Sequence, residues 1–167
     1  MKKCIVIMLC AALGMGSAVV SGMIQEQKQA EPSEAFAQMM NPFTDSDSLE
    51  EAERLVGFSI MIPEKIDGSS KRIYRSMGQS LLEIIYEDRE ENEIARVRKG
   101  TGEADISGDY NEYALEETVV VKGKQIQLKG ENNRFQLAVW NENGYSYSVS
   151  TNGLSLEKMK ELVGGIE

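Results

Sequence analysis

Oxygen-bearing side chains crowd one segment of the chain, and their spacing is the first feature that could support chemistry. Asp105, Ser107, Asp109 and Glu112 lie close together in the sequence and bring several oxygen atoms to one segment. Oxygen ligands repeated at short intervals are typical of calcium loops. Gly108, however, stands fourth in this segment, whereas a calcium loop has its glycine sixth. A solvated acidic loop is therefore the alternative to a calcium site.

The same acidic segment raises the question of glycoside hydrolysis. Glu116 and Glu117 follow Asp105 and Asp109, and two carboxylates at a suitable separation cleave a glycosidic bond. A wall-sugar hydrolase also needs a long groove lined by aromatic side chains, and the chain has one Trp. A carboxylate-dependent hydrolase stays an alternative, and the sequence favours a protein without catalytic activity.

Other catalytic chemistries lack the residues they need. The chain contains no His, and its two Cys residues, Cys4 and Cys10, both precede the folded part. The common catalytic triads and zinc sites therefore cannot be assembled there. Ser155 and Lys158 have the S-x-x-K spacing of penicillin-recognising enzymes, but Ser155 stands where a helix cap belongs. We expect no enzyme and no cofactor.

The N-terminus has the pattern of an export signal. Lys2 and Lys3 precede an apolar run that reaches Ile24. Cleavage after Ala18 gives a secreted protein, whereas retention gives a membrane anchor with the rest of the chain outside, and both remain open. We predict a signal peptide or anchor over residues 1–24, a flexible linker over 25–47 and a folded domain over 48–167.

The domain is predicted to begin and end with a helix. Ser48 can cap a first helix, with Glu51 completing a capping box and Gly57 ending it. The apolar stripe of this helix consists of Leu49, Ala52, Leu55 and Val56. Ser155 can cap a last helix, whose apolar face consists of Leu156, Met159, Leu162 and Val163.

Between the helices the apolar residues alternate with period two. The alternation predicts strands over residues 58–62, 72–76, 80–87, 94–98, 118–122, 124–129, 135–140 and 145–150. Asn143 and Gly144 are a strong hairpin signal, and the last four strands form a meander. We therefore predict an α+β fold, in which an antiparallel sheet of about seven or eight strands packs both helices on one face.

One face of the last hairpin is a candidate partner surface. We expect Phe135, Leu137 and Val139 to face the helices together with Tyr145, Tyr147 and Val149. The residues left on the opposite face are Gln136, Ala138, Trp140, Ser146, Ser148 and Ser150. A single Trp beside small hydroxyls suits a shallow site for a peptide or a wall glycan, and an ordinary solvated face is the alternative.

Four stretches of the chain resemble a domain family of unknown function. They cover residues 51–63, 94–102, 121–128 and 137–148. That family occurs in secreted or membrane-anchored proteins of Gram-positive, often gut, bacteria, sometimes in contexts similar to anti-sigma factors or sporulation proteins. The resemblance implies an extracytoplasmic location and gives no catalytic or binding residue.

These observations lead to an expected function. We expect a non-enzymatic binding or sensing module at the bacterial cell envelope, with an envelope protein, a peptide or a wall glycan as partner. A small carrier of a lipophilic ligand is the alternative beside the hydrolase. The formal net charge of −9 disfavours nucleic acid, and membrane contact is expected only through the N-terminal segment.

Overall fold

A computed structural model describes residues 41–167. The predicted leader and the predicted linker up to residue 40 lie outside this range. Within it, no helix is both long and apolar enough to cross a membrane. The described residues belong to one unit, and the side chains of its core cluster all come from this part of the chain.

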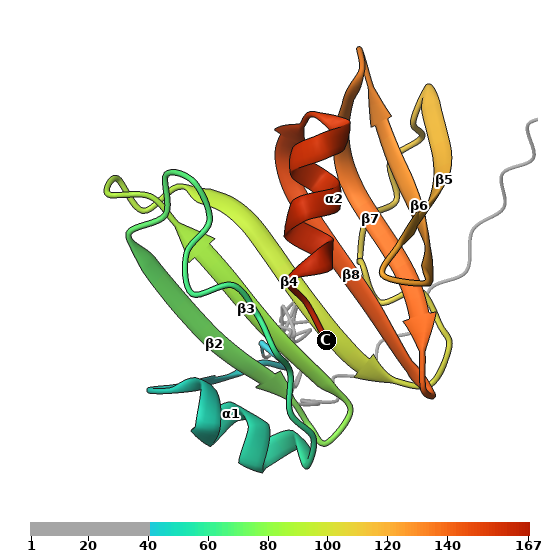
Figure 1. Cartoon of the computed structure of the whole chain (residues 1–167). Coiled ribbons are helices and arrows are strands. Elements are labelled where there is room, and N and C mark those ends of the chain that lie inside the picture. Colours follow the sequence, from blue (N-terminus) through green and yellow to red (C-terminus); the bar gives the residue numbers. More distant parts are fainter. Residues whose placement is uncertain (1–40) are drawn as a thin grey trace, which may run out of the picture. The chain divides into compact units, whose positions relative to one another are not determined.

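Eight strands and two helices make up this unit (Figure 1). They are β1 (Thr44–Ser46), α1 (Leu49–Val56), β2 (Lys71–Met77), β3 (Leu81–Glu87), β4 (Glu93–Thr101), β5 (Leu115–Val121), β6 (Lys124–Glu131), β7 (Arg134–Glu142), β8 (Tyr145–Leu154) and α2 (Leu156–Gly164). The predicted α+β class is confirmed, since the sheet is antiparallel and the helices lie outside it.

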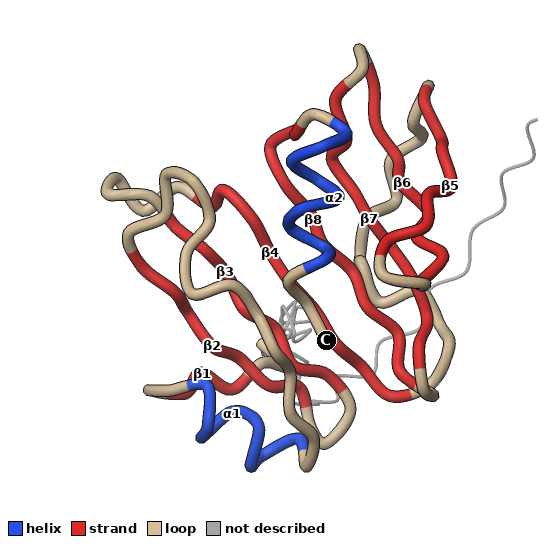
Figure 2. Tube along the Cα trace, in the orientation of Figure 1, coloured by secondary structure: helices blue, strands red, loops and turns tan. Residues whose placement is uncertain are grey.

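The sheet consists of two meanders joined edge to edge. Its strand order is β1-β2-β3-β4-β8-β7-β6-β5, and every neighbouring pair is antiparallel. The predicted C-terminal meander is β5 to β8. Strand β4 pairs with β8, so a long connection over residues 102–114 must carry the chain from the middle of the sheet to its far edge (Figure 2).

Both helices begin at the predicted caps. The Ser48 side chain accepts a hydrogen bond from the Glu51 amide, and the Ser155 side chain accepts one from the Lys158 amide. Such caps satisfy amides that have no partner inside the helix. Leu55, which the sequence pattern placed on the buried stripe of α1, is 42% exposed instead.

One face of the sheet carries the hydrophobic core, and we call it the core face. Leu82, Ile84 and Tyr86 of β3 pack there with Ile126 and Leu128 of β6. Ala52 and Val56 from α1 and Met159, Leu162 and Val163 from α2 enter the same buried cluster. The opposite side of the sheet is the second face.

The strand predicted over residues 58–62 is not part of the sheet. Ile60 is buried and Met61 is exposed, so the predicted alternation is present. The segment covers the core instead of joining a neighbouring strand. Its backbone exchanges hydrogen bonds with the last residue, from Met61 N to Glu167 O at 2.8 Å and from Glu167 N to Met61 O at 3.1 Å.

The end of the predicted linker is also different, because residues 44–46 form β1. This short strand pairs with Ser76, Arg75 and Tyr74 of β2. Asp45 accepts a hydrogen bond from Arg75 Nε at 3.0 Å across the pair. A polar strand of three residues has no apolar alternation to reveal it, so composition alone indicated a linker.

Strand β7 presents the opposite faces from those predicted. Trp140 pairs with Tyr147 and Ala138 pairs with Val149, and all four enter the core cluster. Leu137 pairs with Ser150 on the second face. A shift of register between Phe135 and Leu137 lets Phe135 still reach the core although Leu137 does not.

Candidate functional site

The partner surface predicted from the sequence is largely covered. Trp140 lies on the core face and is 4% exposed. Ser146 and Ser148 are on the second face as predicted, but both are buried. Gln136 and Ser150 are half-buried. The open, serine-lined face expected from the sequence is therefore not present at Trp140, Ser146 and Ser148.

An ion cluster on the second face holds the covering loop in place. Glu83 of β3 is 1% exposed and lies 2.7 Å from Arg98 Nη2, with Arg75 and Arg96 at 3.7 and 3.5 Å. Arg98 Nη1 also donates hydrogen bonds to the carbonyl oxygens of Ile106 and Ser107. Arg98 thus connects the buried carboxylate to the loop that lies over the serines.

Gly108 of this loop lies against the end of the Arg98 side chain. Gly108 has φ +65°, and a Cβ atom added there would lie 2.8 Å from Arg98 Nη1. Such a φ is rare for residues with a side chain. Ser146 also holds the loop, because its hydroxyl donates a hydrogen bond to the carbonyl oxygen of Gly102 at 2.9 Å. The loop is accordingly built to cover this part of the sheet.

The calcium candidates use their oxygen atoms within the loop itself. Asp105 Oδ1 accepts a hydrogen bond from the Ser107 amide, and Ser107 Oγ accepts one from the Asp109 amide. Asp109 accepts further bonds from Asn111 and Tyr113, and Glu112 is exposed. Among residues 41–167 no three acidic side chains are grouped closely enough to hold a metal ion.

A different site lies on the core face, near the turn between β7 and β8. It is a pocket of about 520 Å³ that we call the basic pocket. Its lining residues are Lys99, Lys122, Lys124, Glu142, Asn143, Tyr145, Tyr147 and Glu167. Three lysines around one pocket are unusual in a chain whose net charge is −9.

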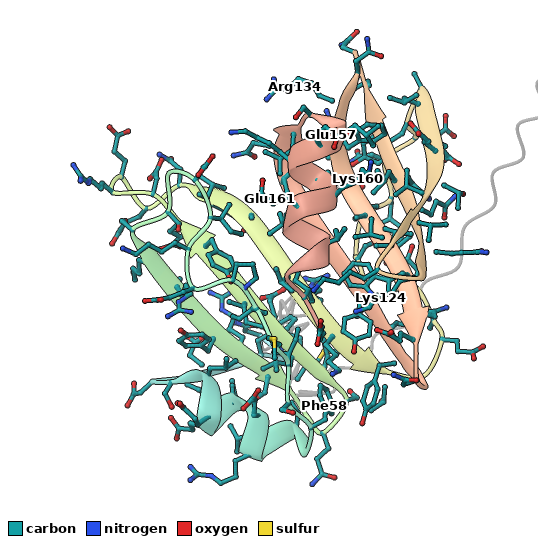
Figure 3. All side chains as sticks on the ribbon, in the orientation of Figure 1. Phe58, Lys124, Arg134, Glu157, Lys160 and Glu161 are labelled. Atoms are coloured by element: carbon teal, nitrogen blue, oxygen red, sulfur yellow. The ribbon has the colours of Figure 1, made fainter. Side chains whose placement is uncertain are left out.

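Strand pairing brings the central residues of the pocket together. Lys99 near the end of β4 pairs with Tyr147 of β8, and Thr101 pairs with Tyr145. Lys124 begins β6 on the other side of the hairpin. Figure 3 shows Lys124 and Phe58 at the end of the sheet where these strands turn, with Phe58 in the segment that follows α1.

Lys99 is the most unusual of these side chains. It is 8% exposed, and its ammonium donates a hydrogen bond to the Ser59 carbonyl at 2.7 Å. The nitrogen lies 4.8 Å from the ring centre of Tyr145 and 5.1 Å from that of Tyr147. Rings at these distances attract a cation through their negative faces.

The ammonium of Lys99 differs from its neighbours in forming no ion pair, although Glu142 and Glu53 attract it from a greater distance. Lys124 forms an ion pair with Glu142 at 2.9 Å, and Lys122 forms one with Glu167 at 3.3 Å. Within the described part of the chain, no carboxylate lies within ion-pair distance of Lys99. Burial accordingly lowers the pKa of Lys99 below its usual value.

Two ring contacts pack the aromatic side of the pocket. The rings of Trp140 and Tyr147 are stacked, with centres 4.9 Å apart and planes 5° apart. Phe58 packs against Tyr145 with ring centres 5.1 Å apart. Burial raises the pKa of the Tyr147 hydroxyl, so this group stays a neutral hydrogen-bond donor.

These features suit the binding of an anionic group. A carboxylate or phosphate placed beside Lys99 would supply the missing negative charge, and phenolic hydroxyls could donate hydrogen bonds to it. No motif in the sequence indicated this site, since its residues come from four separate parts of the chain. The only local signal was a Lys at a position of β4 where the alternation calls for an apolar residue.

Residues 59–166 match a family profile described as "Domain of unknown function (DUF4367)". The chain belongs to the DUF4367 family. The match contains Lys99, Tyr145 and Tyr147, and it begins at Ser59, whose carbonyl binds Lys99. It leaves out α1 and β1, which precede the DUF4367 match. No curated protein and no solved structure matches the chain.

Proposed function

We propose that the chain is an extracytoplasmic, non-enzymatic binding or sensing module of the bacterial cell envelope, and that the basic pocket is its binding site. The location rests on Lys2, Lys3 and the apolar run to Ile24, which are typical of a signal peptide or membrane anchor. The resemblance described above adds to the proposal a Gram-positive origin and a context similar to that of anti-sigma factors.

The observation that carries the proposed binding role is the buried ammonium of Lys99. A buried charge without a counter-charge costs free energy, and natural domains seldom keep one without use. Apolar residues fill the equivalent positions of the neighbouring strands, such as Leu82 in β3, which pairs with Lys99. A Lys retained there is consistent with a bound anion.

The fold around the pocket supports binding better than catalysis. In the described residues, the acidic side chains nearest to the pocket, Glu142 and Glu167, are each paired with a lysine. We also propose that both helices pack on the core face, because Val56 of α1 and Val163 of α2 enter one buried cluster. That packing gives the pocket a fixed frame.

The lipophilic-carrier alternative has less support. A pocket of about 340 Å³ lies between α2 and the segment after Pro63, with Ile66 and Leu162 in its lining. An ion pair between Lys158 and Asp67, 2.9 Å apart, stands at its edge. A cavity for an acyl chain is expected to be lined mainly by apolar side chains, and this one is not.

The binding proposal is tested by titrating the protein with small anions. The chain has one Trp, and Trp140 stacks on Tyr147 of the pocket, so its fluorescence reports on the site. Inorganic phosphate and acetate serve as probes, with acetamide as the neutral control. We expect a saturable change with the anions and none with acetamide.

Variants decide whether the signal comes from the pocket. Lys99→Met should weaken anion binding by about tenfold or more, because the removed charge is the one without a partner. Lys160→Met on α2, which is not among the residues that line the pocket, is the matched control and should bind as the unchanged protein does. Equal affinities of the Lys99→Met and unchanged proteins would refute the proposal.

A further inference from the structure

A second pocket lies around Arg72 at the start of β2, and we call it the arginine pocket. Its volume is about 700 Å³, larger than that of the basic pocket. The segment before β2, the start of β2 and the turn after β3 surround it, and they meet at one end of the sheet (Figure 1). The lining residues with hydrogen-bond donors at their ends include Lys65, Ser69, Arg72 and Arg89.

The arginine pocket is separate from the basic pocket. The two have no lining residue in common. Arg72 pairs with Tyr86 of β3. Lys99 pairs with Leu82, about 13 Å away along the same strand. Binding at the two pockets can therefore be measured separately.

The guanidinium of Arg72 has no carboxylate to pair with. Arg72 is half-buried, and its charged carbon lies 5.7 Å from the ring centre of Tyr74. Among residues 41–167, no Asp or Glu lies within ion-pair distance of it. Arg75 of the same strand has two such partners, Asp45 at 3.0 Å and Glu83 at 3.7 Å. Arg72 thus keeps N–H donors for a ligand.

The hydroxyl of Tyr86 does not supply the missing negative charge. It donates a hydrogen bond to the Pro63 carbonyl oxygen at 2.6 Å. Burial raises the pKa of Tyr86 to about 12, although the charge of Arg72 opposes this rise. The phenol is therefore neutral near neutral pH. In the described part of the chain, the surroundings of Arg72 are aromatic and polar, and they bring no counter-charge within ion-pair distance.

Other donors approach the pocket from different sides. Lys65 and Arg89 are both exposed, and neither forms an ion pair within residues 41–167. Ser69 Oγ accepts a hydrogen bond from the Ile66 amide at 3.1 Å, so its own proton remains for a ligand. Donors from three elements suit a tetrahedral oxyanion, which accepts hydrogen bonds from several directions, better than a planar carboxylate.

We propose that the arginine pocket binds a phosphate group, with the guanidinium of Arg72 as its main donor. Lys65 and Arg89 add positive charge, and the Ser69 hydroxyl donates a hydrogen bond. Guanidinium and phosphate form charge-assisted bonds of matching geometry. A soluble phosphate ester and the head group of a phospholipid share this chemistry. Binding of the free ester in solution distinguishes the first source from the second.

Three carboxylates also line the pocket and limit its affinity. Asp88 Oδ1 accepts hydrogen bonds from the amides of Glu90 and Asn92, so this side chain holds the turn. Glu64 and Glu90 are exposed, and water and salt screen their charges. We therefore expect weak binding of inorganic phosphate, with a dissociation constant of about 1–10 mM at low salt.

Nuclear magnetic resonance locates the binding residue by residue. Inorganic phosphate and glycerol 3-phosphate are titrated into the chain over residues 41–167, which contains the whole core cluster. The amide signals of residues 68–72 and 88–90 should shift saturably with both. Acetate should bind there several-fold more weakly, and the neutral acetamide should cause no shift. The amides of Lys99 and Tyr145 report on the basic pocket in the same spectra.

Charge variants test the role of Arg72. Arg72→Gln should weaken phosphate binding at the arginine pocket about tenfold or more, because a charged hydrogen-bond donor is lost. Arg54→Gln on α1 makes the same change at a residue that does not line the pocket, so binding should be unchanged. Glu90→Gln should tighten binding about two- to threefold, since it removes a repelling charge. This exposed change tests the proposal even if Arg72→Gln destabilises the fold.

Vesicles give the lipid arm of the test. Phosphatidylglycerol vesicles that retain the unchanged chain but not Arg72→Gln, without binding of the free ester, would assign the phosphate to a lipid head group. Four results would overturn the proposal. They are no shift at residues 68–72 with any phosphate probe or vesicle, equal binding of acetate and phosphate, unchanged binding by Arg72→Gln, and weaker binding by Glu90→Gln. Signals at Lys99 are read independently, so none of these results bears on the basic pocket.

Discussion

Trp140 is a packing residue on the core face. Its ring stacks on Tyr147, and its indole nitrogen has no hydrogen-bond partner in the described part of the molecule. Trp140→Phe should therefore cost about 1–2 kcal/mol of unfolding free energy, because only ring area is lost. Trp140→Ala should cost about 3–5 kcal/mol, because it leaves a cavity.

Urea denaturation followed by circular dichroism measures both variants of Trp140. If Trp140→Phe were as damaging as Trp140→Ala, the indole nitrogen would have to make a bond that matters for stability. Such a result would contradict the role in packing alone that the structure assigns to this side chain.

The lowered pKa of Lys99 has a consequence for stability against pH. Burial disfavours the charged ammonium in the folded state, so the folded protein releases this proton at a lower pH than the unfolded chain does. Between the lowered pKa and 10.5 the unfolded state binds more protons, and the contribution of Lys99 to stability rises with pH. Below that window the contribution is constant.

Lys99→Met removes this titration and serves as the comparison. The difference in melting temperature between Lys99→Met and the unchanged protein should be constant near neutral pH. It should shift in favour of the unchanged protein as the pH rises toward 10.5. A difference that moves in the other direction would mean that the folded state stabilises the ammonium.

The face of Trp140 could have been predicted from its hairpin. The turn at Asn143 and Gly144 has two residues, so Glu142 must pair with Tyr145, and counting back pairs Trp140 with Tyr147. Opposed residues share a face, which places Trp140 with the tyrosines. The predicted faces are wrong because Leu137 and Val139 do not share a face with Phe135: they lie on the second face, opposite Ser150 and Ser148.

At the scale of elements, the pairing of β1 leads to a prediction about where the folded unit begins. The sequence placed its start at Ser48, whereas β1 begins at Thr44 and pairs with β2. A chain over residues 41–167 should be more stable than one over 48–167, by about 1–2 kcal/mol for the lost strand pairing and the lost ion pair of Asp45 with Arg75.

Parallel denaturation curves of the two chains give this difference. Asp45→Asn in the longer chain is the matched control, since it keeps the strand and removes only the charge. Equal midpoints for the 41–167 and 48–167 chains would show that β1 adds nothing to the sheet.

At this scale, the correct predictions from the sequence depended on local signals. Helix caps such as Ser48 and Ser155 and turns such as Asn143-Gly144 act over a few residues, so the sequence contains them in full. The segment 58–62 shows the limit of that method. A segment covering the core alternates as a strand does, and only the distant residue Glu167 distinguishes the two.

At the scale of the whole molecule, neither the basic pocket nor the place of β5 at the edge of the sheet could be predicted, because both depend on the strand order. Lys99 meets Tyr145 and Tyr147 only because β4 pairs with β8, which joins the two meanders. β5 becomes an edge for the same reason, since β8 takes the inner place. No short-range pattern in the chain specifies that pairing.

The end of the chain closes the core near the pocket, which leads to a last prediction. Ile166 is fully buried in the core cluster, and Glu167 exchanges two backbone hydrogen bonds with Met61. Removing residues 166 and 167 should therefore cost about 3–5 kcal/mol, from the lost side chain and the freed backbone groups. The loss should spread beyond the terminus, because Ser59 beside this segment accepts the hydrogen bond from Lys99.

Amide exchange separates a local effect from a global one. Without residues 166 and 167, the Ile60 and Met61 amides should exchange faster, and Trp140 fluorescence should change as the pocket loses the Ser59 carbonyl that holds Lys99. Glu167→Gln keeps both backbone bonds and removes only the ion pair with Lys122, so it should cost less than about 1 kcal/mol. If Glu167→Gln were as damaging as the deletion, the exposed ion pair would hold this end of the molecule, and the backbone pairing with Met61 would be secondary.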